Sequence, residues 1–387
     1  MQAQKHRTAV HIDPFKPAEG QKGLMNRWHP DIPAFCSVKP GEVFNVECHD
    51  WVGGQIGNND SSDDIKIHNL SGPIAVEGAK TGDVLVVDIL DVTPFPDMQW
   101  GYTGIFESIY ATSRHIPGVR FAGIPHPGLI GTMPSQELLD KWNKREGELI
   151  AANEGCCPEV ALPPTAKGAY VGQDLPDKVR EKVYKEGART IPGREHGGNV
   201  DIKNLSRGSR CYFPVYVDGA NLAVGDLHFS QGDGELSFCG AIEMTSIIKD
   251  GVKKLGLRQP IFLPSPIDPK YHEQIIFQGV SVDVHGDGKQ YSMDATVAYK
   301  QAALNCFDYL NRLGYSREQA YLLCSAAPVE AHVGAIVDVP NACVTMGLPR
   351  AIFDRDILPT EDGLEKRDYG QAAIRSDGVR CKQPNLK

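Results

Sequence analysis

The chain has 387 residues and a formal net charge of −9, with 41% hydrophobic and 23% charged residues. A chain of this size can bury a sizeable core without disulfides or metal staples, so a metal site found in it is free to be functional. No basic stripe with interleaved aromatic residues is present, which argues against a nucleic-acid partner. No apolar run reaches the roughly 18 to 20 residues that cross a bilayer, which argues against a membrane protein. Ten cysteines without disulfide-framework spacing indicate reduced thiols and predict a cytoplasmic protein.

The predicted elements are mostly strands. In chain order, runs rich in β-branched and aliphatic residues predict strands at 42–47, 83–92, 211–217, 236–248 and 336–346, the last interrupted by Pro340. Helices are expected at 135–154, which begins with Ser135, at 294–313, which Gly314 ends, and at 316–327, which begins with a candidate capping box. The charged run 174–189 reads as a solvated helix or loop. The sequence therefore predicts a mostly β protein with a C-terminal helical element.

Three polar loops next to predicted strands carry the candidate chemistry, and the third, residues 225–235, is the densest. Asp226 and His228 lie two residues apart, so on an extended strand both point to the same face. Glu235 follows a Gly-Asp-Gly turn that can bring its carboxylate beside them. Two carboxylates and an imidazole at one point are the ligand types of zinc or a similar ion. The alternative is a purely structural hairpin turn, for which Asp-Gly pairs are common.

The other two loops are less specific. In the second, residues 191–201, Glu195, His196 and Asp201 supply an imidazole ligand and carboxylates for base catalysis, or else an exposed ion pair and a turn. In the first, residues 48–55, His49 and Asp50 point to opposite sides of a continued strand, so only one of them is expected at a shared site.

The remaining histidines and the cysteines carry weaker signals. His126 lies in a rigid Pro-His-Pro-Gly loop that can line a pocket. His332 is interpreted as an ordinary core or surface histidine. No cysteine has a local motif typical of a nucleophile. Ordinary loop or surface positions are expected for His68, His115, His272 and His285.

Four strings of residues together resemble the formamidase/acetamidase family, and especially its fungal formamidase branch. They are 50–55, 126–132, 198–203 and the Gly-Asp-x-His-x-x-Gln-Gly-Asp-Gly-Glu string at 225–235. The resemblance runs from about Val43 to Phe353. It implies an N-terminal arm at 1–40, a single catalytic domain at 41–355, β-rich to about 250 and α/β over about 251–355, and a C-terminal tail at 356–387.

The resemblance also implies a function. It implies a hydrolase that acts on formamide or a similarly short linear amide and releases ammonia and a short carboxylate. It implies packed, sandwich-like sheets with an α/β C-terminal part carrying a few helices, homo-oligomers and an association with metal ions.

The resulting hypothesis is a metal-dependent amidohydrolase in which zinc lowers the pKa of a bound water to about 7. Candidate catalytic carboxylates are Glu195, Asp233 and Glu235, with the choice of general base left open. Candidate metal ligands are Asp50, His196, His228 and Glu235, with Asp201 and Asp226 as alternates. Candidate substrate contacts are Trp51, Gln55, His126, Asn199 and Gln231.

Two rival interpretations remain at this level. One is an amidase with a cysteine nucleophile. The other is a non-enzymatic β-sandwich binding protein whose acidic loops hold calcium, which takes oxygen ligands. Two of the candidate ligands, His196 and His228, argue against calcium because imidazole suits zinc-like metals.

Overall fold

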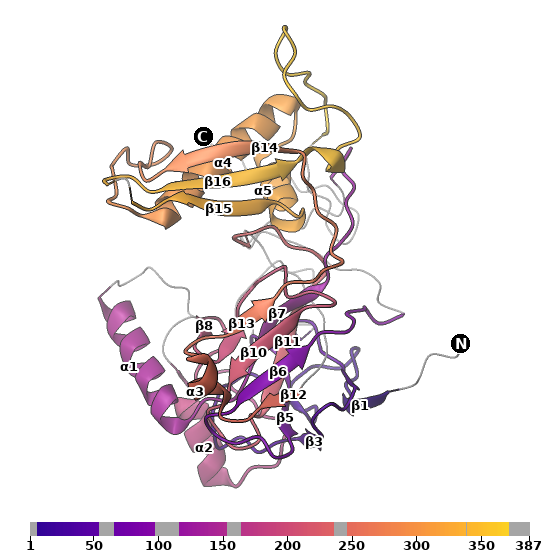
Figure 1. Cartoon of the computed structure of the whole chain (residues 1–387), viewed down its shortest axis with the longest axis vertical. Helices are drawn as coiled ribbons and strands as arrows, with labels where there is room; N and C mark the ends of the chain where they lie inside the picture. Colours follow the sequence, from indigo (N-terminus) through magenta and orange to yellow (C-terminus); the bar gives the residue numbers. More distant parts are fainter. Residues whose placement is uncertain are drawn as a thin grey trace. The chain divides into compact units, whose positions relative to one another are not determined.

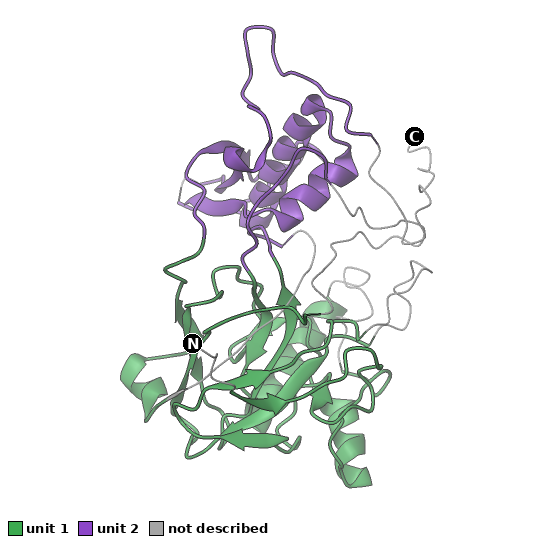
Figure 2. Ribbon diagram, turned by 90° about the vertical axis from the view of Figure 1, so that its right-hand side faces the viewer, with its two compact units in different colours: residues 1–100, 125–229, 240–268 green, residues 101–124, 230–239, 269–387 purple. Residues whose placement is uncertain are grey.

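The computed structural model describes residues 6–53, 66–96, 116–152, 164–235, 246–337 and 339–370. The chain forms two compact units, drawn in two colours in Figure 2. Unit 1 comprises residues 1–100, 125–229 and 240–268, and unit 2 comprises 101–124, 230–239 and 269–387. Each unit is therefore assembled from separated stretches of the chain, and the domain boundaries expected from the sequence stay a prediction.

Unit 1 is built on two larger sheets and a two-stranded parallel pair (Figure 1). The seven-stranded sheet has the order β2-β5-β11-β7-β9-β8, with β3 paired to β5, and the four-stranded sheet has the order β12-β6-β10-β13. The pair joins β1 (Arg7–Val10) to β4 (Phe44–Val46). The bounds in the seven-stranded sheet are β2 Leu24–Met25, β3 Cys36–Val38, β5 Leu70–Val76, β7 His126–Gly131, β8 Gly193–Arg194, β9 Gly197–Asn199 and β11 Leu222–His228. Those in the four-stranded sheet are β6 Val84–Asp88, β10 Arg210–Pro214, β12 Ser246–Ile248 and β13 Ile261–Leu263, and the short helix α3 covers Gly251–Leu255.

The core of unit 1 lies between the two larger sheets. Ile130 and Val224 of the seven-stranded sheet share one hydrophobic cluster with Leu85 and Phe213 of the four-stranded sheet. The opposite face of the seven-stranded sheet is covered by helices α1 (Gln136–Ala151) and α2 (Asp177–Glu186), which bury a second cluster against it (Leu129, Ala223, Leu139, Trp142, Val183). Because successive side chains of a strand point to opposite faces, a sheet covered on both sides needs apolar residues throughout. The expectation of packed sheets in a mostly β protein is confirmed.

Unit 2 is the α/β part. Helices α4 (Ala295–Leu313) and α5 (Arg317–Ala326) pack against a three-stranded sheet of order β14-β16-β15 (Figure 1). Its strands are β14 Gln274–Val280, β15 Glu330–Ala335 and β16 Cys343–Pro349, followed by a 3-10 turn at Arg350–Ile352. Among the described residues, no helix combines the length and the apolar character needed to cross a membrane.

The helix signals in the sequence are reproduced closely. The Ser135 hydroxyl accepts a hydrogen bond from the Leu138 N–H at the start of α1. The Asp294 side chain caps α4, which Gly314 ends in the left-handed conformation. The capping box expected at Ser316 is present, with Gln319 as its partner. These signals survive because capping contacts form within one turn of the chain.

The strand predictions are less accurate at their ends. The strand expected at 336–346, with an interruption at Pro340, is wrong in its bounds, because β15 ends at Ala335 and β16 begins at Cys343. Most of the strand expected at 236–248 lies outside the described residues, and only β12 (246–248) is observed. The charged run 174–189 contains α2, in agreement with its reading as a solvated helix.

Candidate functional site

Strand pairing in the seven-stranded sheet brings two histidines face to face. Strands β11 and β7 are antiparallel, and their register sets His228 opposite His126. The two rings lie 4.9 Å apart between centroids at 60°, and both residues are fully buried. The loop expected around His126 is therefore corrected, because His126 opens β7.

Asp226 lies beside His228, as the strand periodicity predicted. Its Oδ1 is 3.6 Å from Nε2 of His228, and its Oδ2 is 3.7 Å from Nε2 of His68. Asp226 is almost completely buried, and Oδ1 accepts no hydrogen bond within the described part of the chain. Burial raises the pKa of Asp226 to about 6, an effect that the charge of His68 opposes and that of Asp50 reinforces. Its φ of 49° is in the left-handed region, which costs a non-glycine residue about 1–3 kcal/mol.

Asp201 reaches the same imidazole from the loop that follows β9. The carbonyl of Gly128 in β7 accepts hydrogen bonds from the backbone N–H groups of Val200 and Asp201, which fixes this loop against the strand. Oδ1 of Asp201 lies 3.7 Å from Nε2 of His228. Nδ2 of Asn199 donates to Oδ2 of Asp201 over 2.8 Å. Asn199, expected to contact substrate, thus orients a carboxylate of the cluster.

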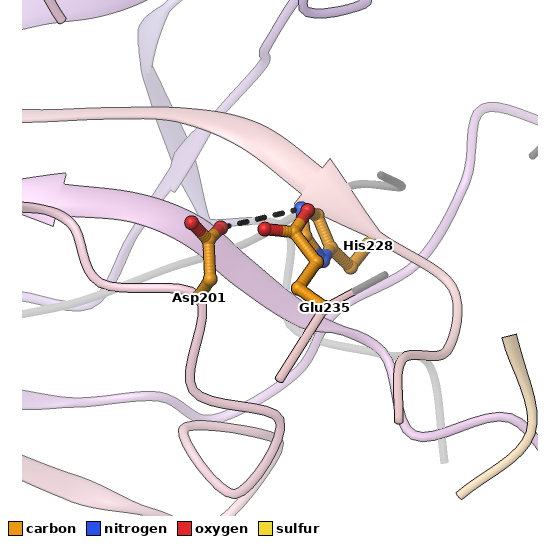
Figure 3. Close-up of side chains that lie close together, drawn as sticks. All are labelled: Asp201, His228 and Glu235. Carbon is orange, nitrogen blue, oxygen red and sulfur yellow. Dashed lines mark ion pairs between the residues drawn. The ribbon is translucent and has the colours of Figure 1, made fainter. Parts of the chain in front are cut away.

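These side chains form a group that can hold a metal ion. Asp201, His228 and Glu235 each offer one ligand atom, and the three atoms lie within 4.8 Å of one another (Figure 3). The sequence reasoning had proposed all three as ligands, from two different loops. Figure 3 shows the carboxylates of Asp201 and Glu235 directed toward the imidazole of His228.

The spacing and the space inside the cluster fit a bound cation. The separations of 3.6 and 3.7 Å from Nε2 of His228 exceed ordinary hydrogen bonds. They are close to the roughly 3.3 Å between ligand atoms of a tetrahedral zinc site with bonds of about 2.0–2.1 Å. A Cβ on Gly128 would lie 2.5 Å from Nε2 of His228 and 2.7 Å from Oδ1 of Asp201, so only glycine leaves this space open. An imidazole with carboxylates is a donor set that suits zinc-like metals.

His68 is the site residue that the sequence reasoning missed. It was expected to be an ordinary loop or surface histidine, yet it is 5% exposed and faces Asp226. Its backbone N–H donates to the hydroxyl of Thr190, and its ring lies 5.6 Å from that of Trp51. Burial lowers the pKa of His68, and the charge of Asp226 opposes this. The signal was indirect: His68 precedes β5, and β5 pairs with β11.

The first loop contributes at the edge of the cluster. Asp50 is exposed, and its negative charge acts on Asp226. Its neighbour His49 contacts the carbonyl oxygen of Lys16 at 2.8 Å instead, in line with the expectation that only one of the pair turns to the site. Trp51 is buried against His68. Gln55, expected to contact substrate, lies outside the described residues.

The structure places Glu195 away from the cluster. Its carboxylate accepts hydrogen bonds from Nε1 of Trp142 at 2.8 Å and from Nη2 of Arg145 at 2.9 Å. These contacts, Arg145 first, lower the pKa of Glu195 to about 2 although partial burial opposes the shift. A carboxylate held by a guanidinium in this way is a poor proton acceptor near neutral pH, so the geometry favours a structural role.

His196 is also separated from His228, contrary to its assignment as a ligand of the same metal. Its ring packs between Trp28 and Trp142, with centroids 4.5 and 4.6 Å away. The next residue, Gly197, pairs with Gly131 at the end of β7 opposite to His126. Five residue steps along a strand span roughly 16 Å, too far for a shared ion. Burial lowers the pKa of His196 well below its usual value, as expected of a neutral packing residue.

Asp233 and Gln231 are held within unit 2. Oδ2 of Asp233 accepts the backbone N–H of Ala331 at 2.9 Å, and its carbonyl accepts the Tyr299 hydroxyl at 2.6 Å. The carboxylate thereby fixes the start of β15, which favours a structural role over that of general base. Gln231 is buried.

Cys48, which contacts β11 of this sheet, does not have the properties of a nucleophile. Cys48 is buried, with Sγ 3.8 Å from the carbonyl oxygen of Val224. Burial raises the pKa of the Cys48 thiol to about 12. A thiol in this environment is protonated at neutral pH and therefore unreactive.

Comparison with known proteins identifies the family. Residues 11–355 match the model of the Acetamidase/Formamidase family. The chain belongs to this family. The resemblance found in the four sequence strings is thereby confirmed.

Relatives of known name cover nearly the whole chain. The formamidase of Methylophilus methylotrophus is 52% identical, over 92% of this chain and 96% of the relative. A fungal relative from Schizosaccharomyces pombe is 48% identical over 91% of this chain and 95% of its own length, in agreement with the expected fungal resemblance. Among solved structures, a gamma lactamase from Delftia acidovorans superposes with a TM-score of 0.89 at 47% identity, covering 95% of this chain and 98% of that one.

Proposed function

We propose that this chain is an amidohydrolase that cleaves formamide or a similarly short linear amide and releases ammonia and a short carboxylate. Membership of the family and 52% identity to a formamidase support this reaction class. The observation that carries the proposal is the cluster of the buried Asp226 and His228 with the partly buried Asp201. A buried carboxylate at Asp226 and a partly buried one at Asp201, both facing one imidazole, are costly to maintain unless they bind something.

We propose that a divalent metal, with zinc as the first candidate, is held by Asp201, Asp226 and His228, with Glu235 beside them. When bound, such an ion supplies polarisation of the amide carbonyl and activation of water. Three observations support this metal site: the ligand-like spacing, the buried Oδ1 of Asp226 and the space kept open by Gly128.

The chain's own residues orient the ligands and control the proton. His68 faces Oδ2 of Asp226 and Asn199 donates to Oδ2 of Asp201, and each carboxylate presents Oδ1 to His228. The ring of His126 packs on that of His228 and limits its rotation. Glu195 and Asp233 are bound elsewhere, so we propose Glu235 as the group that takes the proton of the attacking water and delivers it to the departing ammonia.

The test is ammonia release from formamide and acetamide before and after exhaustive chelation, with the metal content of the same sample. We expect activity to be lost on chelation and restored by zinc. His228→Ala should lose both metal and turnover, whereas His272→Ala, at an exposed position, is the matched control. Full activity in verified metal-free protein would refute the metal proposal, but it would not contradict the proposal that the chain is an amidase.

A second substrate class follows from one specific observation. The solved structure with a TM-score of 0.89 is named a gamma lactamase, and a γ-lactam is a cyclic amide. We propose that this chain also opens small lactams, because the same carbonyl and nitrogen take part. A γ-lactam added to the amide panel tests this, and no ring opening at enzyme levels that turn over formamide would exclude it.

We further propose a cytoplasmic location and a homo-oligomer. Cys36, Cys48, Cys211, Cys306, Cys324 and Cys343 are free thiols, which suits a reducing compartment. Size-exclusion chromatography with light scattering tests the oligomeric state, and cell fractionation tests the location.

A further inference from the structure

A small cavity in unit 1 is lined by an unusual concentration of positive charge. Its volume is about 30 Å³. Four of its lining residues are basic and none is acidic, and one of the four, Lys66, also pairs with Glu19 outside the lining. The lining residues are Asn26, Arg27, Lys66, Ile67, Lys167, Gly168 and Arg189. Such a cavity attracts an anion.

Arg27 is the buried cation of this cavity. It is 3% exposed, and its guanidinium donates only to backbone carbonyls, those of Asn26 at 2.8 Å, Thr165 at 3.1 Å and Lys167 at 3.2 Å. Nε has no hydrogen-bond partner, and no carboxylate pairs with Arg27 among the residues that the structure describes. Burial, with a smaller effect from the charge of Arg189, lowers the pKa of Arg27 to about 10. A buried guanidinium without a counter-charge is costly, and an anion bound beside it removes that cost.

We propose that this cavity binds a small oxyanion of the size of formate, with Arg27 as the principal contact and Lys167 at its rim. Guanidinium groups match planar carboxylates geometrically and bind them strongly. The volume supports a small ligand, because a single water needs roughly 10–15 Å³ of such space. About 30 Å³ therefore accommodates an ion of formate's size, while phosphate is larger.

The cavity is joined to the candidate catalytic cluster by direct chain neighbours. Ile67 of the lining precedes His68, and Arg189 of the lining precedes Thr190. The His68 N–H donates to the Thr190 hydroxyl, and the His68 ring faces Asp226. An anion that repositions the 67–68 and 189–190 segments therefore acts on the histidine that orients Asp226. This coupling rests on the proposed function, under which formate is the product and the cavity is a feedback site.

The binding test uses thermal unfolding with sodium formate, with sodium chloride at equal ionic strength as reference. We expect formate to raise the Tm of the wild-type protein in a saturable manner. The rise should be reduced in Lys167→Gln and lost in Arg27→Gln, and kept in Lys178→Gln, which removes an exposed charge outside the cavity. Since Arg27→Gln can fail to fold, Lys167→Gln carries the test in that case. An equal rise in Lys167→Gln and Lys178→Gln overturns the proposal, and so does the absence of any formate-specific rise.

A second arm separates this site from the candidate catalytic cluster. In His228→Ala the formate-dependent rise should persist, because the cavity does not include that residue. Its loss there would assign formate to the catalytic cluster and overturn the proposal. In the active protein we expect non-competitive inhibition by formate that Lys167→Gln weakens several-fold and Lys178→Gln leaves unchanged. If formate binds at this cavity but neither the wild-type protein nor any variant hydrolyses amides, the proposed function is refuted and the proposal of an anion site still holds.

Discussion

A single methyl group at Gly128 should inactivate this protein without unfolding it. The Cβ of Gly128→Ala would lie 2.5 Å from Nε2 of His228, 2.7 Å from Oδ1 of Asp201 and 2.8 Å from the carbonyl oxygen of Asp226. Non-bonded heavy atoms of this kind prefer separations of about 3.5 Å, so the methyl overlaps its neighbours by roughly 1 Å. The φ of Gly128 lies outside the left-handed region, so the alanine backbone itself is not strained.

The expected magnitudes differ between stability and activity. Forcing an extra methyl into a packed interior typically costs about 1–3 kcal/mol, which a chain of this size can tolerate. Displacing reactive groups by about 1 Å can cost roughly 100-fold in rate. We therefore expect kcat/KM for formamide to fall at least about 100-fold, and bound metal to be lost with it.

Gly131→Ala is the matched control on the same strand. A Cβ there would lie 2.6 Å from the Gly198 nitrogen and 2.9 Å from the His196 carbonyl oxygen, so it crowds β9 at the far end of β7. Both variants should lower Tm by similar amounts, but Gly131→Ala should keep its turnover per folded molecule. Ammonia release gives the turnover, elemental analysis the metal content and thermal unfolding the Tm, all measured on the same samples of both variants. A folded Gly128→Ala protein with wild-type turnover and metal content would refute the reasoning.

The remaining predictions concern three side chains. His68→Ala should reduce kcat/KM by about 10–100-fold, because the partner that orients Asp226 is removed. Steady-state kinetics test this with His272→Ala as the control, and equal kcat/KM values for the two variants would contradict the prediction. Glu195→Gln should keep kcat within a few-fold of wild type but lower the free energy of unfolding at pH 7, with about 3 kcal/mol as an upper bound that screening at the half-exposed Arg145 reduces. Because the folded pKa of Glu195 is depressed to about 2, this stabilisation is complete above its unfolded value of about 4.5 and fades as pH falls toward 2, so urea unfolding of both proteins should converge there. Cys48→Ala should retain amide hydrolysis, and a dead but folded variant would revive the cysteine mechanism.

Some features were open to prediction because they depend on neighbours along the chain. The caps at Ser135 and Ser316 act within one helical turn, and the sequence states them directly. The nearness of Asp226 to His228 was predicted from the two-residue period of a strand, and it is observed although the φ of 49° at Asp226 departs from extended backbone. The family resemblance rested on the same local strings, which the comparisons then confirmed.

Other features were decided only when distant segments met. The sequence could not separate His196 from His228, since both lie in glycine-flanked polar loops, yet the register of β7 with β9 and β11 places them at opposite ends of one strand. Nor could it show that Glu195 is neutralised by Arg145, fifty positions away on α1.

By itself, then, the sequence determined the strand-rich class, the helix ends, the family and the Asp226–His228 pair, because these follow from periodicity and short-range contacts. Only the tertiary structure brought His68 to Asp226 and placed Gly128 where a side chain would fill the space between His228 and Asp201. The physical reason is that strand pairing joins residues far apart in the chain, and its register is fixed by the burial of whole sheet faces and not by any short motif.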